Sequence, residues 1–284
     1  MRSPIPARRR WGQNFLVDRS AAERIVKAAV IAPSVSVVEI GPGDGALTRG
    51  LAAAGGRLLA IEIDPARADA LGKEFAGRDD VAIEGGDALE RTIGERLAGR
   101  GWPVPAVVVG NLPYNAATPI LRSAVRESGA VSRVVATVQR EVALRLFARP
   151  GSRDYGYLSL FMAIFCDGEI LFDLPPGAFR PRPNVLSSVV RLRVRHPADA
   201  AEVERVLEIA SRAFGSRRKT LPNALGGGSE RGPWETALAA IGKSPTARAE
   251  ELSPADFFAL AAAAKAAKSH PPPPSPGGEG VEEQ

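Results

Sequence analysis

The feature that most constrains this chain is a glycine-rich turn, Gly41-Pro42-Gly43-Asp44-Gly45, which follows the apolar run Val35–Ile40. Glycine lets the backbone turn sharply and approach a ligand without a clash at Cβ, and the open N–H groups of a following helix can face that ligand. Glu62 ends the next apolar run, twenty-one residues after Gly41. A carboxylate at that place can accept hydrogen bonds from both hydroxyls of a ribose. Strand, glycine turn, helix and acid in this order predict a site for an adenosine-containing cofactor.

The glycine turn alone does not identify the cofactor. Because Ala46 fills the last place, these residues also satisfy the dinucleotide pattern G-x-G-x-x-[GA], so NAD and S-adenosylmethionine both stay open at this point. Asp87 follows the third apolar run and adds a polar group where an adenine amine would be read. A helix N-cap is an equally good interpretation of that aspartate.

Apolar runs rich in β-branched residues alternate with helix-like stretches along most of the chain. The predicted strands are Val35–Ile40, Leu58–Ile63, Val81–Glu84, Ala106–Gly110, Arg133–Val138, Leu158–Phe165 and Ser187–Val194. The predicted helices are Ser20–Val30, Ala46–Ala54, Ala66–Phe75, Thr118–Ser128 and Glu141–Ala148. This alternation predicts an α/β fold with a doubly wound, Rossmann-like, mostly parallel sheet. A proline-rich loop joins the last two strands, so we expect an antiparallel hairpin at one sheet edge.

Residues from Glu202 onward show helical periodicity only, which indicates a small helical domain. Its predicted helices are 202–214, 221–225, 234–241 and 256–268, with a glycine break at 226–228. Ser253 followed by Pro254 is typical of a helix start. The residues after 268 are rich in Pro, Gly and Glu, a composition that predicts disorder.

Charge and composition narrow the class of protein. The net charge of +5 and the pI of about 9.7 favour a polyanionic partner such as nucleic acid, although arginine usage in a GC-rich genome is a competing explanation. The two histidines, His196 and His270, lie near no other metal-ligand type at useful spacing, so we expect no metal and no Ser-His-Asp site. No apolar run reaches the roughly 20 residues of a membrane span. The lone Cys166 fits a reducing, cytoplasmic location and a buried, unreactive position.

The sequence Asn111-Leu112-Pro113-Tyr114 stands at the carboxyl end of the predicted strand Ala106–Gly110. The N6 amine of adenine is a poor nucleophile because its lone pair is delocalised into the ring. The side-chain oxygen of Asn111 and a backbone carbonyl of Leu112 or Pro113 can hold both N6 hydrogens and draw the nitrogen towards a tetrahedral geometry. Pro113 fixes the backbone and the ring of Tyr114 stacks on the base. Since only the ring stacks, we expect phenylalanine to replace Tyr114 with little loss.

With this tetrapeptide in place, the sequence resembles the adenine N6,N6-dimethyltransferase family of small-subunit ribosomal RNA along nearly its whole length. The resembling blocks are GQNFL (12–16), EIGPGDGALT (39–48), IEID (61–64), GDAL (86–89), GNLPYN (110–115), TPIL (118–121), QREVALRL (139–146), DYGYLSL (154–160), PPGAFRPRPNV (175–185), SRRKTLPNAL (216–225) and ARAEELS (247–253). The resemblance implies dimethylation of two adjacent adenines in a 3′-terminal hairpin loop of 16S RNA, from S-adenosylmethionine, by a monomer acting on a pre-30S particle.

The resemblance also implies roles for individual residues. S-adenosylmethionine contacts fall on Asn14, Leu16, Gly41, Glu62, Asp87 and Asn111. The methyl-acceptor clamp falls on Asn111, Pro113 and Tyr114, with Phe179 as the second face of a base sandwich. The chain then divides into a basic N-terminal segment with the cofactor-lid motif GQNFL (1–20), a methyltransferase domain (21–197), a helical RNA-binding domain (198–268) and a disordered tail (269–284).

Some residues depart from the family pattern, which more often has Ser, Arg, Lys and Asp where Ala117, Tyr157, Asn184 and Leu186 stand. None of these four residues belongs to the cofactor set, so the departures put the RNA contacts in doubt and not the reaction.

The nearest rival family methylates large-subunit (23S) RNA and confers macrolide resistance; it more often shows N-I-P-Y. DNA adenine methyltransferases usually carry D-P-P-Y and a larger target-recognition domain. An NAD-dependent oxidoreductase or a non-catalytic assembly protein would leave the N-L-P-Y sequence unexplained.

Two basic clusters have RNA-binding and solvated-surface interpretations. Arg217, Arg218 and Lys219 match a family block and can meet phosphate, so we predict an RNA contact there. Arg8-Arg9-Arg10, next to Trp11, fits an RNA contact and a solvated tail about equally well.

Overall fold

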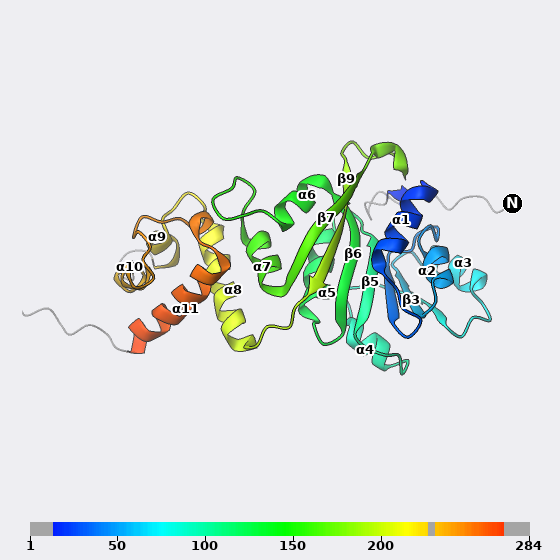
Figure 1. Cartoon of the computed structure of the whole chain (residues 1–284), viewed down its shortest axis with the longest axis horizontal. Helices are drawn as coiled ribbons and strands as arrows, with labels where there is room; N and C mark the ends of the chain where they lie inside the picture. The colour runs from blue at the N-terminus through cyan, green and yellow to red at the C-terminus, as the bar shows by residue number, and fades with distance from the viewer. Residues whose placement is uncertain (1–13, 227–230, 270–284) are drawn as a thin grey trace, which may run out of the picture. The chain divides into compact units, whose positions relative to one another are not determined.

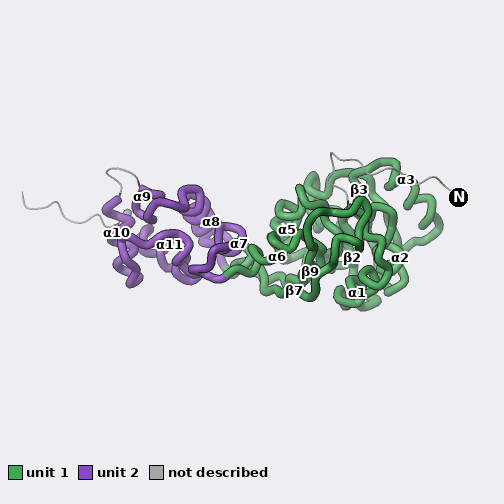
Figure 2. Tube along the Cα trace, turned by 90° about the horizontal axis from the view of Figure 1, so that it is seen from above, with its two compact units in different colours: residues 1–148, 161–198 green, residues 149–160, 199–284 purple. Residues whose placement is uncertain are grey.

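The computed structural model describes residues 14–226 and 231–269. The described residues fall into two compact units, one formed by residues 14–148 and 161–198 and the other by residues 149–160 and those from Asp199 onward (Figure 2). The predictions for Arg8–Trp11, Gly227, Gly228 and the tail beyond Ser269 lie outside the described residues.

The first unit is built on a seven-stranded sheet with the strand order β4-β3-β2-β5-β6-β9-β7 (Figure 1). The strands are β2 (Ser36–Ile40), β3 (Arg57–Glu62), β4 (Val81–Gly85), β5 (Ala106–Asn111), β6 (Val131–Gln139), β7 (Cys166–Leu174) and β9 (Ser187–Val194). The first five pair in parallel, and β9 pairs antiparallel with both β6 and β7. The doubly wound, mostly parallel sheet with an antiparallel edge hairpin is therefore confirmed.

The helices along the parallel strands are α1 (Arg19–Ala29), α2 (Thr48–Ala53), α3 (Pro65–Glu74), α4 (Ile93–Ala98), α5 (Ala117–Arg126) and α6 (Arg140–Leu146). Four of these helices, α2 to α5, connect the parallel strands, while α1 precedes β2 and α6 follows β6. Strand order reverses between β2 and β5, and right-handed crossovers then place α2 and α3 on one face and α4 and α5 on the other. The strand order thus changes direction at the carboxyl ends of β2 and β5, where open α/β sheets usually bind ligands.

The predicted strand Leu158–Phe165 is wrong. Residues Tyr157–Phe165 form a helix, α7, and the edge strand is β7, Cys166–Leu174. The run YLSLFMAIF is almost continuously apolar, and periodicity cannot separate a buried strand from a buried helix over so few residues. The edge strand was hidden because its first half, Asp167-Gly168-Glu169, is polar and exposed.

A second, two-stranded sheet joins the start of the described chain to the proline-rich loop. In it, β1 (Phe15–Leu16) pairs antiparallel with β8 (Phe179–Arg180), with Leu16 opposite Phe179. Val17 N also donates to Ala178 O at 2.8 Å. The sequence did not predict this ladder, which holds Asn14 and Phe15 next to the main sheet.

The second unit is helical. Its helices are α8 (Ala200–Gly215), α9 (Leu221–Leu225), α10 (Arg231–Ala240) and α11 (Pro254–Ser269), with Ser253 Oγ accepting from Asp256 N at the start of α11. The sequence assigned residues 149–160 to the methyltransferase domain, but they join this unit. Tyr155 shows why, because its buried hydroxyl donates to Leu252 O at 2.9 Å and its ring packs edge-on against Phe214.

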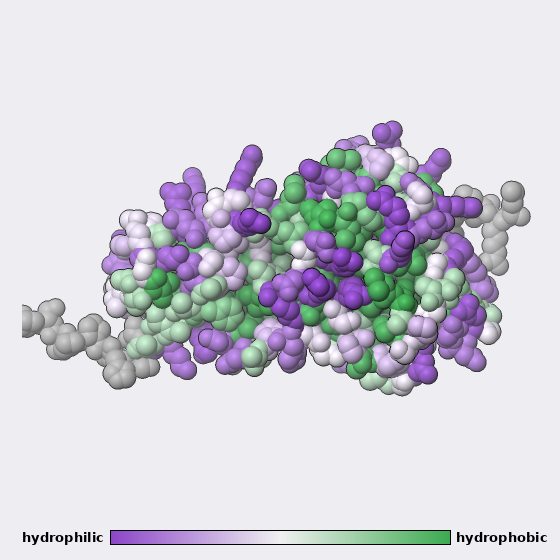
Figure 3. All heavy atoms as spheres, viewed as in Figure 1, coloured by the Kyte–Doolittle hydropathy of each residue, from purple (hydrophilic) through white to green (hydrophobic). Residues whose placement is uncertain are grey.

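Hydrophilic side chains cover much of the face drawn in Figure 3, with hydrophobic atoms showing between them. No helix among the described residues is long and apolar enough to cross a membrane. Cys166 is buried, and burial raises the pKa of its thiol to about 12, as expected for an unreactive position.

Candidate functional site

The carboxyl ends of three neighbouring parallel strands bring the predicted cofactor residues together. Gly41 follows β2, Glu62 ends β3 and Asn111 ends β5, and β2 lies between the other two. Gly41, Gly43 and Gly45 all have φ between 57° and 80°, a region that L side chains rarely adopt. A cavity of about 50 Å³ at this edge is lined by Asn14, Phe15, Gly41, Gly43, Glu62, Ile63, Asn111, Leu112 and Pro113.

Glu62 is only 2% exposed and shapes the glycine turn. One carboxylate oxygen accepts from Gly43 N at 2.8 Å and the other from Asp64 N at 2.9 Å. Burial raises the pKa of Glu62, and these two backbone donors oppose the rise. Each oxygen keeps a further lone pair, so the carboxylate can still accept from ribose hydroxyls.

The side chain of Phe15 covers the glycine turn. A Cβ placed on Gly43 would lie 2.8 Å from Phe15 Cδ1, so only glycine fits beneath this ring. The guanidinium of Arg67 lies over the same ring, 4.3 Å from its centroid. The described part of the GQNFL motif, residues 14–16, therefore lies beside the turn, with the ring of Phe15 against Gly43.

The side chain of Asn111 is held by a residue that is distant in the sequence. Its Nδ2 donates to the carbonyl oxygen of Asn14 at 2.8 Å. Because that bond fixes the amide, Oδ1 is left as the acceptor of the side chain. Gly110 lets β5 approach β2 closely, since a Cβ there would lie 2.7 Å from Ile40 O.

Tyr114 follows Asn111 and Pro113 on the same loop and is half-buried. Its hydroxyl lies 2.6 Å from Ser187 Oγ, and Ser187 is the fully buried first residue of β9. Burial raises the pKa of Tyr114, and the hydrogen bond with Ser187 opposes the rise. The far end of the ring is thus anchored to the sheet, an interaction that the sequence did not predict.

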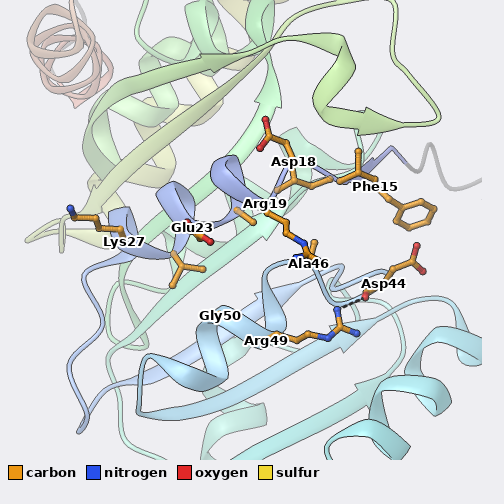
Figure 4. A pocket seen from close by; sticks show the side chains of 13 residues that line it. Phe15, Asp18, Arg19, Glu23, Lys27, Asp44, Ala46, Arg49 and Gly50 are labelled. Atoms are coloured by element: carbon orange, nitrogen blue, oxygen red, sulfur yellow. Dashed lines mark hydrogen bonds between the residues drawn. The ribbon is translucent and has the colours of Figure 1, made fainter.

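A larger cleft of about 800 Å³ opens between α1 and α2 (Figure 4). Phe15, Leu16, Asp44 and Ala46 line both this cleft and a neighbouring small cavity. Arg49 braces the turn from this side, because its guanidinium donates to Asp44 O at 3.0 Å and to Glu74 at 2.6 Å.

Two predicted site residues, Phe179 and Asp87, have contacts that the sequence did not predict. Phe179 is 1% exposed and packs in the core beside Leu16, so stacking on a base would require its ring to be uncovered. In this structure the ring has a packing role, and its place in a base sandwich stays a prediction. Asp87 is not the N-cap of α4; Thr92 is. The Asp87 side chain instead accepts from Leu89 N at 2.9 Å, and buried Arg96 donates to its carbonyl oxygen at 2.7 Å.

The three residues of the basic cluster divide into two kinds. Arg217 donates to Tyr155 O at 3.1 Å and to Arg153 O at 3.3 Å, within the second unit. Arg218 and Lys219 are exposed. Arg217 therefore has a structural task, whereas its two neighbours are available to a phosphate.

The described residues suit a nucleoside cofactor better than a metal. The glycines form a cradle that a Cβ would fill at Gly43, beside the carboxylate of Glu62. Over residues 14–226 and 231–269, no group of three or more His, Cys, Asp or Glu side chains could hold a metal ion.

Sequence comparison places this chain among named proteins. The family described as "Ribosomal RNA adenine dimethylase" matches residues 6–265. A "Ribosomal RNA small subunit methyltransferase A" of Methylococcus capsulatus is 45% identical over 260 residues, which cover 89% of this chain and 96% of that protein. The protein of the same name from Rubrobacter xylanophilus is 44% identical and covers 91% of this chain and 95% of its own length.

Two solved structures share the fold over most of the chain. The 23S rRNA methyltransferase ErmE has a TM-score of 0.65 and 27% identity, with 89% of this chain and all of that chain covered. A dimethyladenosine transferase from Plasmodium falciparum has a TM-score of 0.71 and 21% identity, and the match covers 87% of this chain and 95% of that chain. The second likeness is one of fold alone.

Proposed function

Because this chain belongs to the ribosomal RNA adenine dimethylase family, we propose that it dimethylates two adjacent adenines in a 3′-terminal hairpin loop of 16S RNA, as a cytoplasmic monomer acting on a pre-30S particle. The family resemblance seen in the motif blocks is confirmed, and with it the activity, dimethylation of rRNA adenines from S-adenosylmethionine. The observation that supports the proposal is that Asn111 and Pro113 line one cavity with Gly41 and Gly43 of the glycine turn, with Tyr114 next along the chain.

The proposed chemistry needs two acceptors for the adenine N6 hydrogens. Asn111 Oδ1 is one, since Nδ2 is tied to Asn14 O. Pro113 O already accepts from Ala116 N at 3.0 Å, which favours the carbonyl of Leu112 as the second. Holding both hydrogens withdraws the nitrogen lone pair from the ring and directs it at an electrophile. Tyr114 stacks on the extruded base, and no general base is required because a methylated ammonium loses its proton readily.

S-adenosylmethionine, when bound, supplies the electrophilic methyl group. We assign its contacts to Asn14, Leu16, Gly41, Glu62, Asp87 and Asn111, of which Asn14, Gly41, Glu62 and Asn111 line one cavity. Product analysis tests the function: with labelled S-adenosylmethionine and unmodified rRNA, digestion to nucleosides should yield N6,N6-dimethyladenosine. Label confined to another nucleoside would contradict the assignment of the base clamp.

Cofactor identity can be tested by calorimetry. S-adenosylhomocysteine should bind and NADH should not, and Glu62→Ala should weaken S-adenosylhomocysteine by at least tenfold, because two charge-assisted acceptors are lost from the ribose site. Glu208→Ala, at an exposed glutamate of α8 in the second unit, is the matched control and should bind normally. Binding of NADH without binding of S-adenosylhomocysteine would overturn the assignment.

RNA affinity should depend on Arg218 and Lys219 more than on Arg217. Removing two phosphate contacts with Arg218→Ala and Lys219→Ala should weaken binding to small-subunit particles and flatten the slope of log K against log[salt] by about one to two units. Arg217→Ala should instead lower the melting temperature, because Arg153 O and Tyr155 O lose their donor. A double variant with an unchanged salt slope would show that the cluster is only a solvated surface.

Large-subunit RNA is the alternative substrate. The chain is 27% identical to ErmE, a 23S rRNA methyltransferase, but 39–45% identical to small-subunit enzymes. The higher identity favours 16S RNA as the substrate. Methyl transfer to isolated 50S particles in preference to 30S particles would favour this alternative.

A further inference from the structure

Arg67 is a buried charged side chain that the proposed mechanism does not use. It lies in the first turn of α3 and is only 1% exposed, although burial of a guanidinium is unfavourable unless partners surround it. Its Nε lies 3.1 Å from Oδ1 of Asp44 in the glycine turn, and its Nη1 lies 3.1 Å from Oδ2 of Asp64, the N-cap of α3. Asp64 N in turn donates to Glu62 at 2.9 Å. The arginine therefore joins the start of α3 to the glycine turn.

The same guanidinium has a third partner, the ring of Phe15, whose centroid lies 4.3 Å away. A guanidinium is planar, so its edge can pair with acids while its face packs on an aromatic ring, which a lysine ammonium cannot do. The ring also lies against Gly43, where an added Cβ would come within 2.8 Å of Phe15 Cδ1. Gly43 and Arg67 together hold the ring beside Asp44 (Figure 4).

Phe15 stands between two residues of the proposed cofactor set, Asn14 and Leu16. Successive side chains of an extended segment point to opposite sides, so a ring that is fixed against the glycine turn directs both neighbours away from itself. Asn14 lines the cavity of about 50 Å³ and its carbonyl oxygen accepts from Asn111 Nδ2 at 2.8 Å. Leu16 pairs with Phe179 in the two-stranded sheet. The contacts of the Phe15 ring therefore help to set where residues 14–16 lie.

We propose that Arg67 is a positioning residue of the cofactor site, which acts through the ring of Phe15 to hold Asn14 and Leu16 in place for S-adenosylmethionine. The proposal rests on the proposed function, since it assumes that cofactor. Arg67 belongs neither to the assigned cofactor contacts nor to the base clamp. Its effect passes through Phe15, so the two side chains act as one unit.

A segment 14–16 that is held less firmly should release the cofactor sooner. Arg67→Leu should therefore speed the dissociation of S-adenosylhomocysteine by about 2- to 30-fold, the range expected for the loss of one cation–aromatic contact. The KM for S-adenosylmethionine should rise, whereas kcat should fall by less, because Asn111 and Tyr114 stay in the chain. Arg67→Lys keeps the positive charge but not the flat face, so its dissociation rate should lie between those of the native protein and Arg67→Leu.

The test measures the dissociation of labelled S-adenosylhomocysteine from the full chain after addition of an excess of unlabelled ligand. Phe15→Leu removes the ring but keeps every charge, and it should speed dissociation as Arg67→Leu does. The double variant should release the ligand no faster than the faster single variant, because both changes remove the same contact. Arg24→Leu is the matched control: the Arg24 guanidinium lies 3.6 Å from the centroid of the Phe172 ring, and neither residue lines the two small cavities at the cofactor site. It should keep the native dissociation rate.

Melting curves of the same preparations separate positioning from a merely structural role. Lower melting temperatures with native dissociation rates, or additive effects in the double variant, would overturn the inference and leave the cofactor assignment intact. Arg67→Leu leaves the buried Asp64 without its arginine; should this variant fail to fold, Arg67→Lys combined with Phe15→Leu decides by the same criterion. If S-adenosylhomocysteine does not bind to the native chain at all, the proposed function itself fails.

Discussion

Asn111→Ala is expected to lower the rate of methyl transfer by roughly 10²–10³, because a pre-placed polar group that acts in the transition state typically contributes that much. S-adenosylhomocysteine affinity should change by much less, since Gly41 and Glu62 remain in place. Single-turnover transfer to unmodified 30S particles and calorimetry of the same preparation measure the two effects separately.

Asn115→Ala is the matched control, because Asn115 is an exposed asparagine on the same loop. It should retain the native rate. Asn111→Asp keeps an acceptor but loses the Nδ2 donor to Asn14 O, so its rate should fall between those of the native enzyme and Asn111→Ala. An Asn111→Ala variant that loses cofactor affinity and turnover in equal measure would mean that Asn111 acts on the cofactor alone.

Tyr114→Ala should lower activity by roughly 5- to 150-fold with cofactor binding nearly intact, because base–aromatic stacking contributes about 1–3 kcal/mol. The hydrogen bond to Ser187 changes our expectation for phenylalanine. Tyr114→Phe keeps the ring but loses its anchor, a net contribution of about 0.5–1.5 kcal/mol, so it should have a rate between the native and Tyr114→Ala rates.

Ser187 offers a direct check of the anchoring. Ser187→Ala should reproduce the effect of Tyr114→Phe, and the double variant should be no worse than either single one, because both remove the same bond. Ser187→Thr should restore most of the rate, and Ser188→Ala is the neighbouring control, since Ser188 Oγ instead donates to Asp173. Additive losses in the double variant would show that the two hydroxyls act separately.

The parallel part of the sheet could be predicted because each of its strands is a short apolar run bounded by turn residues. Glu62 and Gly41 could be placed at one sheet edge for the same reason: carboxyl ends of parallel strands meet there. The helix α4 was missed, although Thr92 and Glu95 form a capping box that signals its start. The helix α4 has only six residues, too few to show the helical spacing of apolar residues on which the prediction relied.

Contacts between segments that are distant in the chain could not be predicted from the sequence. Asn14 and Asn111 are 97 residues apart, and Tyr114 and Ser187 are 73 apart. No local pattern encodes such pairings, because they depend on how β1 meets β8 and how β9 inserts next to β6. The burial of Phe179 and the hydrogen bonds of Arg217 within the second unit also depend on contacts between distant segments. An aromatic ring suggested a contact with a base and an arginine suggested a contact with phosphate, but in this structure each side chain packs against or bonds to the protein itself.

The most direct test of the central claim is labelled methyl transfer to 30S particles from cells that lack this modification, with naked 16S RNA and 50S particles as controls. We predict that the label appears as N6,N6-dimethyladenosine at two adjacent adenines of 16S RNA and approaches four methyl groups per particle. The 50S particles should stay unlabelled. Transfer to 23S RNA, or none to any adenine, would contradict the account.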